Sequence, residues 1–381
     1  MNKKVYPILL AFLCMGFFDA IGPFVGLSKN EFDISTTTAM IIPFLGFLMF
    51  GVLSIPMSIY QDKKGKKFIL ILGLFVAFAG LIIPIFSLKY FSLFLITVIL
   101  LGAGAATLQV AGNPIMRDVS REGKYSRNLS LGQFIKAIGS LSGSVLPAIA
   151  VLYFGMDWKI LFPVYSIIIL LTILYISTTK LEEKVEKHET PASFSSCLTL
   201  LKNKFVLMMV LGIFVYIGAE VCMSSGIPIH VSSRYGIDIE TFGIFGTGLF
   251  FLALTIGRFL GSVLLNWMKP KKFFAITTIL SVIGILGIFI NSTVITIISV
   301  FLSGLGFANI FPLIFSITVD RMPEKSNELS GLMITAIIGG AFLPPLMGVI
   351  VDNTSTVMGF IVPLAAVCYI CWISLTTLKT K

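Results

Sequence analysis

The basic stretch Asp62-Lys63-Lys64-Gly65-Lys66-Lys67 lies between two long apolar runs, residues 36–60 and 68–87. Each run is long enough to cross a hydrocarbon layer of about 30 Å as a helix. A loop this rich in lysine is retained on the cytoplasmic side of a membrane. The sequence at this point therefore predicts a tight, basic hairpin that joins two membrane-spanning helices.

The composition of the whole chain agrees with this local pattern. Hydrophobic residues make up 56% of the 381 residues and charged residues only 12%, with a mean hydropathy of +0.99. So few charges cannot cover a water-facing surface, which excludes a soluble enzyme, a nucleic-acid-binding protein and a disordered chain. Because lipid offers no partner to open backbone, each apolar run must be helical. Twelve such runs cover approximately residues 5–27, 36–60, 68–87, 91–116, 128–154, 160–178, 204–231, 240–267, 273–291, 293–319, 328–350 and 356–378.

The charges of the loops set the topology. With both ends of the chain placed inside, the cytoplasmic segments hold 22 Lys and Arg residues and the outer loops hold 4. This asymmetry predicts cytoplasmic N- and C-termini. The first run lacks an A-x-A cleavage site and contains Asp19, so we interpret it as a retained helix and not as a signal peptide.

One long polar break divides the chain into two halves. We predict a six-helix bundle over 1–178, a cytoplasmic linker over 179–203 and a second six-helix bundle over 204–381. The halves resemble each other weakly, because Asp19 is followed 201 residues later by Glu220. Parallel repeats of this kind are typical of transporters whose site lies between the repeats.

Four charges lie inside the predicted spans: Asp19, Lys136, Glu220 and Arg258. Each costs about 2.5–3.5 kcal/mol at a helix centre on insertion scales, so each must face water or an opposite charge. One alternative is a set of ion pairs that only holds helices together. For Arg258, near a helix end, a second alternative is a side chain that reaches the aqueous interface.

Amide side chains accompany these charges. They are Gln109 and Asn113, four residues apart in the fourth run, Asn128 and Gln133 in the fifth, and Asn309 in the tenth. Amides that donate and accept in fixed directions suit a hydroxyl-rich solute. We therefore predict that these five residues, with Asp19 and Lys136, bind the substrate; interhelical hydrogen bonding is the alternative.

The loop at 62–67 resembles the major facilitator signature that follows the second helix, G-x-x-x-D-[RK]-x-G-[RK]-[RK]. Ser58 stands where the signature begins with glycine. The resemblance implies that Asp62, Gly65 and Lys66 latch the cytoplasmic side. Arg258, in a helix that belongs to the domain interface of that fold, is added as a gating residue that holds Asp19 or a helix end.

A more specific resemblance is to the fucose permease branch, the sugar–proton symporters for fucose, glucose and galactose. It rests on segments in order along the chain: Phe17-Phe18-Asp19-Ala20-Ile21-Gly22-Pro23, Leu108-Gln109-Val110-Ala111-Gly112-Asn113-Pro114, Arg127-Asn128-Leu129 through Gln133, Tyr216-Ile217-Gly218-Ala219-Glu220-Val221, Asn309-Ile310-Phe311-Pro312, Ile338-Gly339-Gly340-Ala341 and Pro345-Leu346-Met347-Gly348. The resemblance implies that Asp19 contacts sugar. Because Gln109 replaces a titrating glutamate of some members, Glu220 is the predicted coupling acid, with Asp19 as its companion.

These observations predict an all-α major facilitator transporter in a bacterial cytoplasmic membrane, which imports a monosaccharide by proton symport. Sodium is the alternative coupling ion. Lys136 has three alternative partners: Asp19, Glu220 or a carboxylate of the substrate. The last of these keeps open a symporter for an anionic sugar, such as a uronate or sialic acid, or for another carboxylate. A non-transporting nutrient sensor is a further alternative. The only histidines, His188 and His230, do not form a metal motif. We expect no enzyme activity, no cofactor, no nucleic-acid partner and a monomer in the lipid bilayer.

Overall fold

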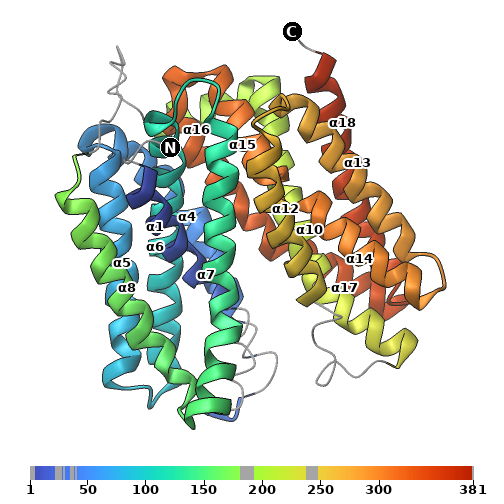
Figure 1. Cartoon of the computed structure of the whole chain (residues 1–381), viewed down its shortest axis with the longest axis horizontal. Helices are drawn as coiled ribbons and strands as arrows, with labels where there is room; N and C mark the ends of the chain where they lie inside the picture. The colour runs from blue at the N-terminus through green and yellow to red at the C-terminus, as the bar shows by residue number, and fades with distance from the viewer. Residues whose placement is uncertain are drawn as a thin grey trace. The chain divides into compact units, whose positions relative to one another are not determined.

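The computed structural model describes residues 5–21, 28, 31–34, 38, 41–180, 193–236 and 248–379. Every regular element among these residues is an α-helix or a 3-10 helix (Figure 1). The chain divides into two compact units.

Most of the predicted spans are present as helices. Within the described residues, nine helical stretches are long and apolar enough to cross a membrane: Ile41–Lys64 (α4), Lys66–Phe86 (α5), Phe91–Val119 (α6), Trp158–Thr178 (ending in α8), Lys204–Tyr235 (α10), Pro270–Ile288 (α13), Thr293–Arg321 (α14 and α15), Pro323–Asn353 (containing α16 and α17) and Met358–Lys379 (ending in α18). Shorter apolar helices are Val5–Asp19 and Leu249–Leu264 (α12), and α7 covers Tyr125–Phe154. The predicted runs 5–27 and 240–267 fall partly on residues outside the described ranges, so the count of twelve stays a prediction.

The first unit comprises residues Met1–Tyr125, Ile135–Thr199 and Met322–Thr335. In it α5 packs against α6 and α8 (Leu161–Thr178), and α4 packs against α6. Helix α16, Ser326–Thr335, also packs on α4 and α6, although it comes from the second half of the sequence. A helix from the C-terminal half of the sequence is therefore packed within this unit.

The second unit comprises residues Ser126–Phe134, Leu200–Arg321 and Ala336–Lys381. Helix α10 packs against α17 (Gly339–Asn353) and α18 (Ile361–Lys379), and α12 packs against α14 (Thr293–Phe307). Contacts thus assign two short segments, 126–134 and 322–335, to the unit opposite to their sequence half. The predicted bundle boundaries at 178 and 204 stay a prediction.

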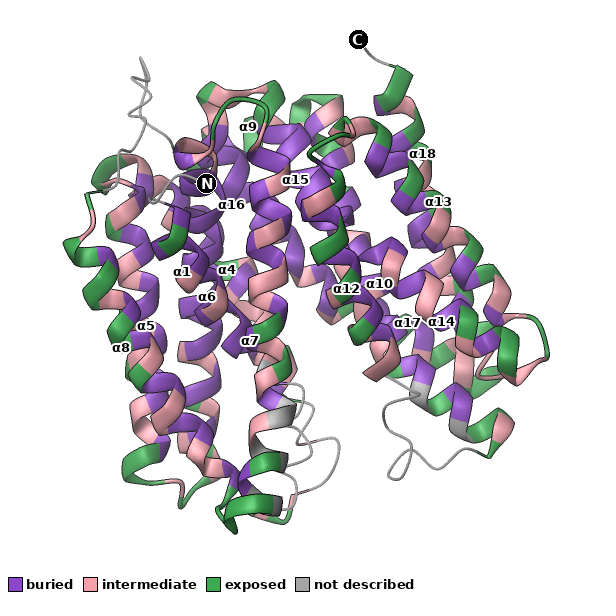
Figure 2. Cartoon of the chain, in the orientation of Figure 1, coloured by how far each residue is buried: buried purple, intermediate pink, exposed green. Residues whose placement is uncertain are grey.

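Burial follows the pattern of a lipid-embedded protein (Figure 2). Large apolar side chains such as Phe75, Leu171, Ile298 and Val349 are exposed, whereas amides such as Asn113 are buried. Lipid tails are as apolar as leucine, so these outward side chains need no protein cover. Polar groups are kept for the interior, where the candidate site lies.

Close helix packing relies on glycine. A Cβ on Gly16 would lie 2.9 Å from the Cα of Gly139, so α1 (Val5–Gly16) and α7 meet backbone to backbone. In the second unit a Cβ on Gly339 of α17 would lie 3.0 Å from the Cα of Phe214 in α10. The first approach brings the end of α1 against the middle of α7, close to Asp19 and Lys136.

Candidate functional site

In the first unit, Asp19 forms an ion pair with Lys136. Helix α1 tightens into a 3-10 helix over Phe17–Ala20, and this segment carries Asp19. Lys136 and Ser140 lie one turn apart on α7, so both face Asp19. The Lys136 Nζ is 3.4 Å from Asp19 Oδ2, and the Ser140 hydroxyl donates to the same oxygen at 2.6 Å. Asp19 keeps a 34% exposed side chain, so a solute can reach it.

The second unit holds the other intramembrane pair. Arg258 Nη2 on α12 lies 3.6 Å from Glu220 Oε1 on α10, with side chains only 10% and 16% exposed. Tyr216, one turn before Glu220, interacts electrostatically with both members of the pair and donates its hydroxyl to the Phe307 carbonyl at 3.1 Å. Each unit therefore presents one acid compensated by one base and accompanied by one hydroxyl.

These pairs bear on two of the predicted partnerships. Lys136 was expected to pair with Asp19, Glu220 or a substrate carboxylate, and the structure shows Asp19. Arg258 was expected to hold Asp19 or a helix end in one gating state. In this structure Arg258 is buried and lies against Glu220 of its own unit, and its gating role stays a prediction.

Two of the predicted substrate amides are buried with unused hydrogen-bonding groups. Asn113 on α6 is fully buried, and neither its Oδ1 nor its Nδ2 has a partner among the described residues. The Nε2 of Gln133 is in the same situation. Gln109, one turn before Asn113, is buried as well. Buried amides without partners are uncommon and mark places where water or a ligand is expected.

The other two amides are engaged within the protein. Asn128 Oδ1 accepts from Arg127 Nε at 3.0 Å and from Arg127 Nη2 at 2.7 Å. Asn309 Nδ2 donates to the Gly257 carbonyl at 2.7 Å, whereas its Oδ1 is buried without a partner among the described residues. The proposed contact of both amides with substrate stays a prediction, and the bonds that they make match the alternative of interhelical and local hydrogen bonding.

The predicted gating residues of the 62–67 loop form a connected set in the first unit. Asp62 Oδ1 accepts from Asn327 Nδ2 of α16 at 3.2 Å, and Gln61 Nε2 donates to Asn327 Oδ1 at 2.8 Å. Gly65 has φ 89°, a conformation that glycine adopts without strain, and it ends α4 before α5 begins. Lys66 forms a buried ion pair with Asp118 of α6 at 2.6 Å. The loop is thereby fixed to α6 and α16.

The linker contributes a short helix, α9 (Phe194–Thr199), which packs on α4 and α16. The side chain of Cys197 on this helix is fully buried, with Sγ 4.0 Å from Ser58 Oγ. Burial raises the pKa of the Cys197 thiol to about 11. No sequence pattern indicates this contact, because a six-residue helix is too short to show a hydrophobic period.

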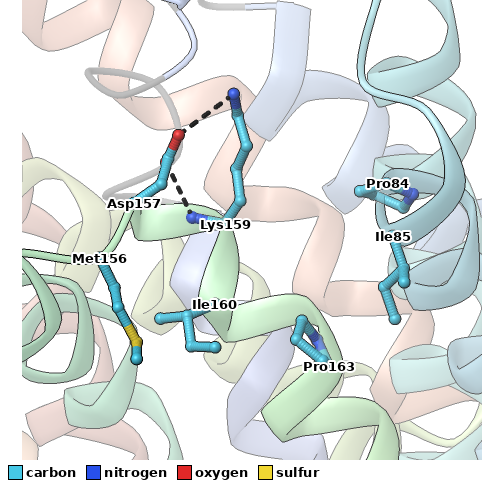
Figure 3. Close-up of a pocket in the computed structure, with 7 residues that line it drawn as sticks. All are labelled: Pro84, Ile85, Met156, Asp157, Lys159, Ile160 and Pro163. Atoms are coloured by element: carbon cyan, nitrogen blue, oxygen red, sulfur yellow. Dashed lines mark hydrogen bonds and ion pairs between the residues drawn. The ribbon is translucent and has the colours of Figure 1, made fainter.

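A pocket of about 390 Å³ lies in the first unit, near the start of α8 (Figure 3). It is lined by Pro84, Ile85, Met156, Asp157, Lys159, Ile160 and Pro163. Its charged groups are bound to one another, since Lys159 Nζ is 3.3 Å from Asp157 Oδ2 and 2.7 Å from Glu31 Oε1. None of the predicted site residues lines it, so it is not the candidate substrate site.

The family model described as Major Facilitator Superfamily matches residues 8–336 and, in a second match, 209–381. The chain belongs to the major facilitator superfamily. Similar superfamily transporters include the glucose/galactose transporter of Brucella abortus, 26% identical over 92% of this chain and 88% of that protein. The L-fucose-proton symporter of Escherichia coli K12 is 23% identical over 93% of this chain and 90% of its own length.

Solved structures agree on the fold. The crystal structure of the major facilitator transporter FucP in the outward conformation aligns with a TM-score of 0.87, covering 99% of both chains at 20% identity. Ser140 and Tyr216 were not among the predicted site residues. Their spacing could have indicated them, because each lies four residues from a predicted site charge, Lys136 or Glu220, and therefore on the same helix face.

Proposed function

We propose that the protein is a monosaccharide importer of the cytoplasmic membrane that couples uptake of a neutral sugar to entry of a proton by alternating access. The relatives named above transport glucose and galactose or L-fucose by their names, and this supports a hexose or deoxyhexose as substrate. The proposal includes twelve spans, cytoplasmic termini and a monomer.

The observation that carries the neutral-sugar assignment is the Asp19–Lys136 pair. Lys136 is the residue that kept an anionic substrate open, because an unpaired ammonium would attract a carboxylate. Its Nζ lies 3.4 Å from Asp19 Oδ2, and the Arg258 guanidinium lies 3.6 Å from Glu220 Oε1. Each of these cations is compensated by an acid of its own unit, so neither is left to balance a uronate or a sialic acid. A neutral sugar needs directional donors and acceptors instead, and Asp19 and Asn113 of the first unit have such groups.

Coupling follows from the same pairs. Each acid lies against a cation of its own unit, so a proton that binds to the acid replaces that cation as its partner. We assign Glu220 as the main proton carrier, because Gln109 cannot titrate, and Asp19 as the acid that also binds sugar. A single charge that moves inward gains about 2.3 kcal/mol per 100 mV. Sodium is the second candidate ion.

The test is uptake by proteoliposomes that contain the purified protein, with an inward proton gradient. Labelled glucose, galactose, fucose and glucuronate are compared, with sodium replaced by choline in a parallel series. We expect accumulation of at least one neutral sugar that a protonophore abolishes and that choline leaves unchanged. Accumulation of glucuronate alone would contradict the neutral assignment, and dependence on sodium would change the coupling ion.

A matched pair of variants makes the test specific. Asp19→Asn should abolish accumulation. Asp157→Asn makes the same chemical change at a 53% exposed carboxylate of the outer pocket and should keep wild-type accumulation. Equal losses in both variants would show that the assay reports folding or insertion and not the site.

A further inference from the structure

Helix α14 does not run directly into α15, and the break carries two hydrogen bonds to other helices. Helix α14 ends at Phe307 and α15 begins at Ile310. Pro312 has no amide hydrogen, so it cannot bond to the Ala308 carbonyl four residues earlier. The helical pattern resumes only where the Leu313 amide donates to the Asn309 carbonyl at 3.1 Å.

Both hydrogen bonds lead to the Glu220–Arg258 pair. The Tyr216 hydroxyl donates to the Phe307 carbonyl at 3.1 Å, and Tyr216 lies one turn before Glu220 on α10. Asn309 Nδ2 donates to the Gly257 carbonyl at 2.7 Å, and Gly257 directly precedes Arg258 on α12. The break is thus joined to the acid through one side chain and to the base through the other.

Glycines let α12 approach this break closely. A Cβ on Gly257 would lie 2.5 Å from Ala308 Cβ, and a Cβ on Gly261 would lie 2.5 Å from Asn309 Nδ2. The Asn309 side chain is only 1% exposed and fills the space beside Gly261. Its Nδ2 is bonded to Gly257, whereas its Oδ1 has no partner among the described residues.

We propose that Asn309 is a positioning residue for coupling and not a sugar ligand: through its hydrogen bond to Gly257 it holds Arg258 against Glu220. The proposal rests on the proposed function of Glu220. The ion pair between Arg258 and Glu220 is long, at 3.6 Å, whereas the hydrogen bond from Asn309 Nδ2 to the Gly257 carbonyl is buried and short, at 2.7 Å. We therefore expect this hydrogen bond to hold the Gly257–Arg258 segment of α12 in position. Removing it allows Arg258 to move away from the acid.

The first experiment needs no substrate. Thermal unfolding of purified wild type, Asn309→Leu, Glu220→Gln and the double variant forms a double-mutant cycle; leucine has the same branched arrangement of heavy atoms as asparagine but donates nothing. We expect Asn309→Leu to lower the Tm by about 3 °C in the wild-type background and by less than half of that when Glu220 is already glutamine. Additive effects would overturn the proposal, whether or not the protein transports sugar.

The second experiment separates coupling from folding in proteoliposomes. Asn309→Ala should reduce proton-driven accumulation about tenfold while downhill exchange of the same sugar falls less than threefold. In Gly261→Ala/Asn309→Ala the added methyl refills the space, so Tm should recover while accumulation stays low. Recovered accumulation would show that Asn309 only fills volume. Thr318→Val, which removes the buried bond to the Ile314 carbonyl on α15, is the control and should leave the ratio of accumulation to exchange unchanged.

If wild-type protein accumulates no sugar, the proposed function fails while the unfolding cycle still decides the positioning role of Asn309. If sugar accumulates and the cycle is additive, the transport assignment stands and the positioning role is wrong. The two proposals are therefore tested separately.

Discussion

The Ser140 hydroxyl lies closer to Asp19 than the Lys136 ammonium does: 2.6 Å against 3.4 Å to the same Oδ2. The serine and the lysine are one turn apart on α7, so a neutral hydrogen-bond donor and a cation both contact the same carboxylate oxygen. The short bond fixes the direction of the carboxylate, while the longer ion pair supplies charge that can be released.

Ser140→Ala is expected to weaken sugar binding without abolishing transport. The variant loses one hydrogen bond to a charged acceptor, and a loss of about 1–2 kcal/mol corresponds to a roughly tenfold higher KM. The maximal rate should change less than threefold, because Lys136 still pairs with Asp19. Initial rates of labelled sugar uptake measure both values. Ser303→Ala, which removes a hydroxyl bonded to the Val300 carbonyl, should leave KM unchanged; an equal rise in KM in both would contradict the prediction.

Removing the charge of Lys136 should offset the loss of stability caused by Asp19→Asn, but it should not restore transport. Asp19→Asn leaves a cation with 13% exposure unpaired and is expected to cost about 1–2 kcal/mol of unfolding free energy. Asp19→Asn/Lys136→Gln removes both charges and should regain most of that loss while transport stays absent. Thermal unfolding and uptake are measured on the same preparations. A double variant less stable than the single one would show that the two residues do not act as a pair.

Glu220→Gln should separate exchange from accumulation. The amide resembles the protonated acid, so both directions of sugar exchange remain available, but no proton can be released inside. Downhill exchange is expected within about threefold of wild type, with accumulation reduced to equilibrium. Counterflow and gradient-driven uptake check this. Glu324→Gln, at an exposed carboxylate, is the control and should behave like wild type. Accumulation by Glu220→Gln with an unchanged pH profile would place the proton site elsewhere.

Ser58 and Gly331 should form a reciprocal size pair in the first unit. Ser58 stands where the signature has glycine. Its side chain fits because the facing residue on α16, Gly331, has none: a Cβ on Gly331 would lie 2.5 Å from Ser58 Cβ. Gly331→Ala should therefore destabilise by about 1–3 kcal/mol. Gly331→Ala/Ser58→Gly should recover most of the lost Tm. If adding Ser58→Gly does not restore the Tm of Gly331→Ala, the side chain of Ser58 is not what excludes a larger residue at position 331.

The buried thiol of Cys197 should be slow to react. Its pKa is raised to about 11 by burial, so little thiolate exists at pH 7.5 and the sulfur is covered. With the other cysteines replaced by alanine, maleimide should label Cys197 at least tenfold more slowly than Ser195→Cys placed in a Cys197→Ser chain. Ser195 is exposed on the same short helix, which makes it a matched control.

The same thiol gives a pH dependence with a definite sign. The pKa in the folded chain lies above the ordinary value of 9.0, so the unfolded chain loses the proton first. The unfolding free energy should therefore fall as the pH rises from about 9 to about 11, and it should fall less in Cys197→Ser. A Cys197→Ser chain with the same slope would assign the effect to another group.

Sequence patterns predicted the features that repeat along the chain. Long apolar runs predicted the helices, and the cost of charge in lipid singled out Asp19, Lys136, Glu220 and Arg258, which the structure places in two pairs. The pairing of Lys136 with Asp19 was among the predicted options. Loop residues Asp62, Gly65 and Lys66 were found through a motif, and the structure joins them to α6 and α16.

What sequence could not predict depends on contacts between distant segments. Nothing local to Asn309 shows that Gly257 lies beside it, and nothing in the 322–335 segment shows that it packs on α4 and α6. The partner of Arg258 was missed for the same reason, since periodicity gives the face of a helix but not the helix opposite. The roles of the site residues in binding, coupling and gating stay predictions until variants are measured.

The exposed apolar side chains described above, among them Phe75 of α5 and Val349 of α17, have a practical consequence. Because these residues meet acyl chains, the width of the surrounding layer enters every measured stability: a bilayer or micelle thinner than the apolar band costs fractions of a kcal/mol per Å of mismatch. A Tm recorded in a short-chain detergent should therefore lie below that in a longer one, with no residue altered. Variants of this chain are comparable only within a single amphiphile of fixed tail length.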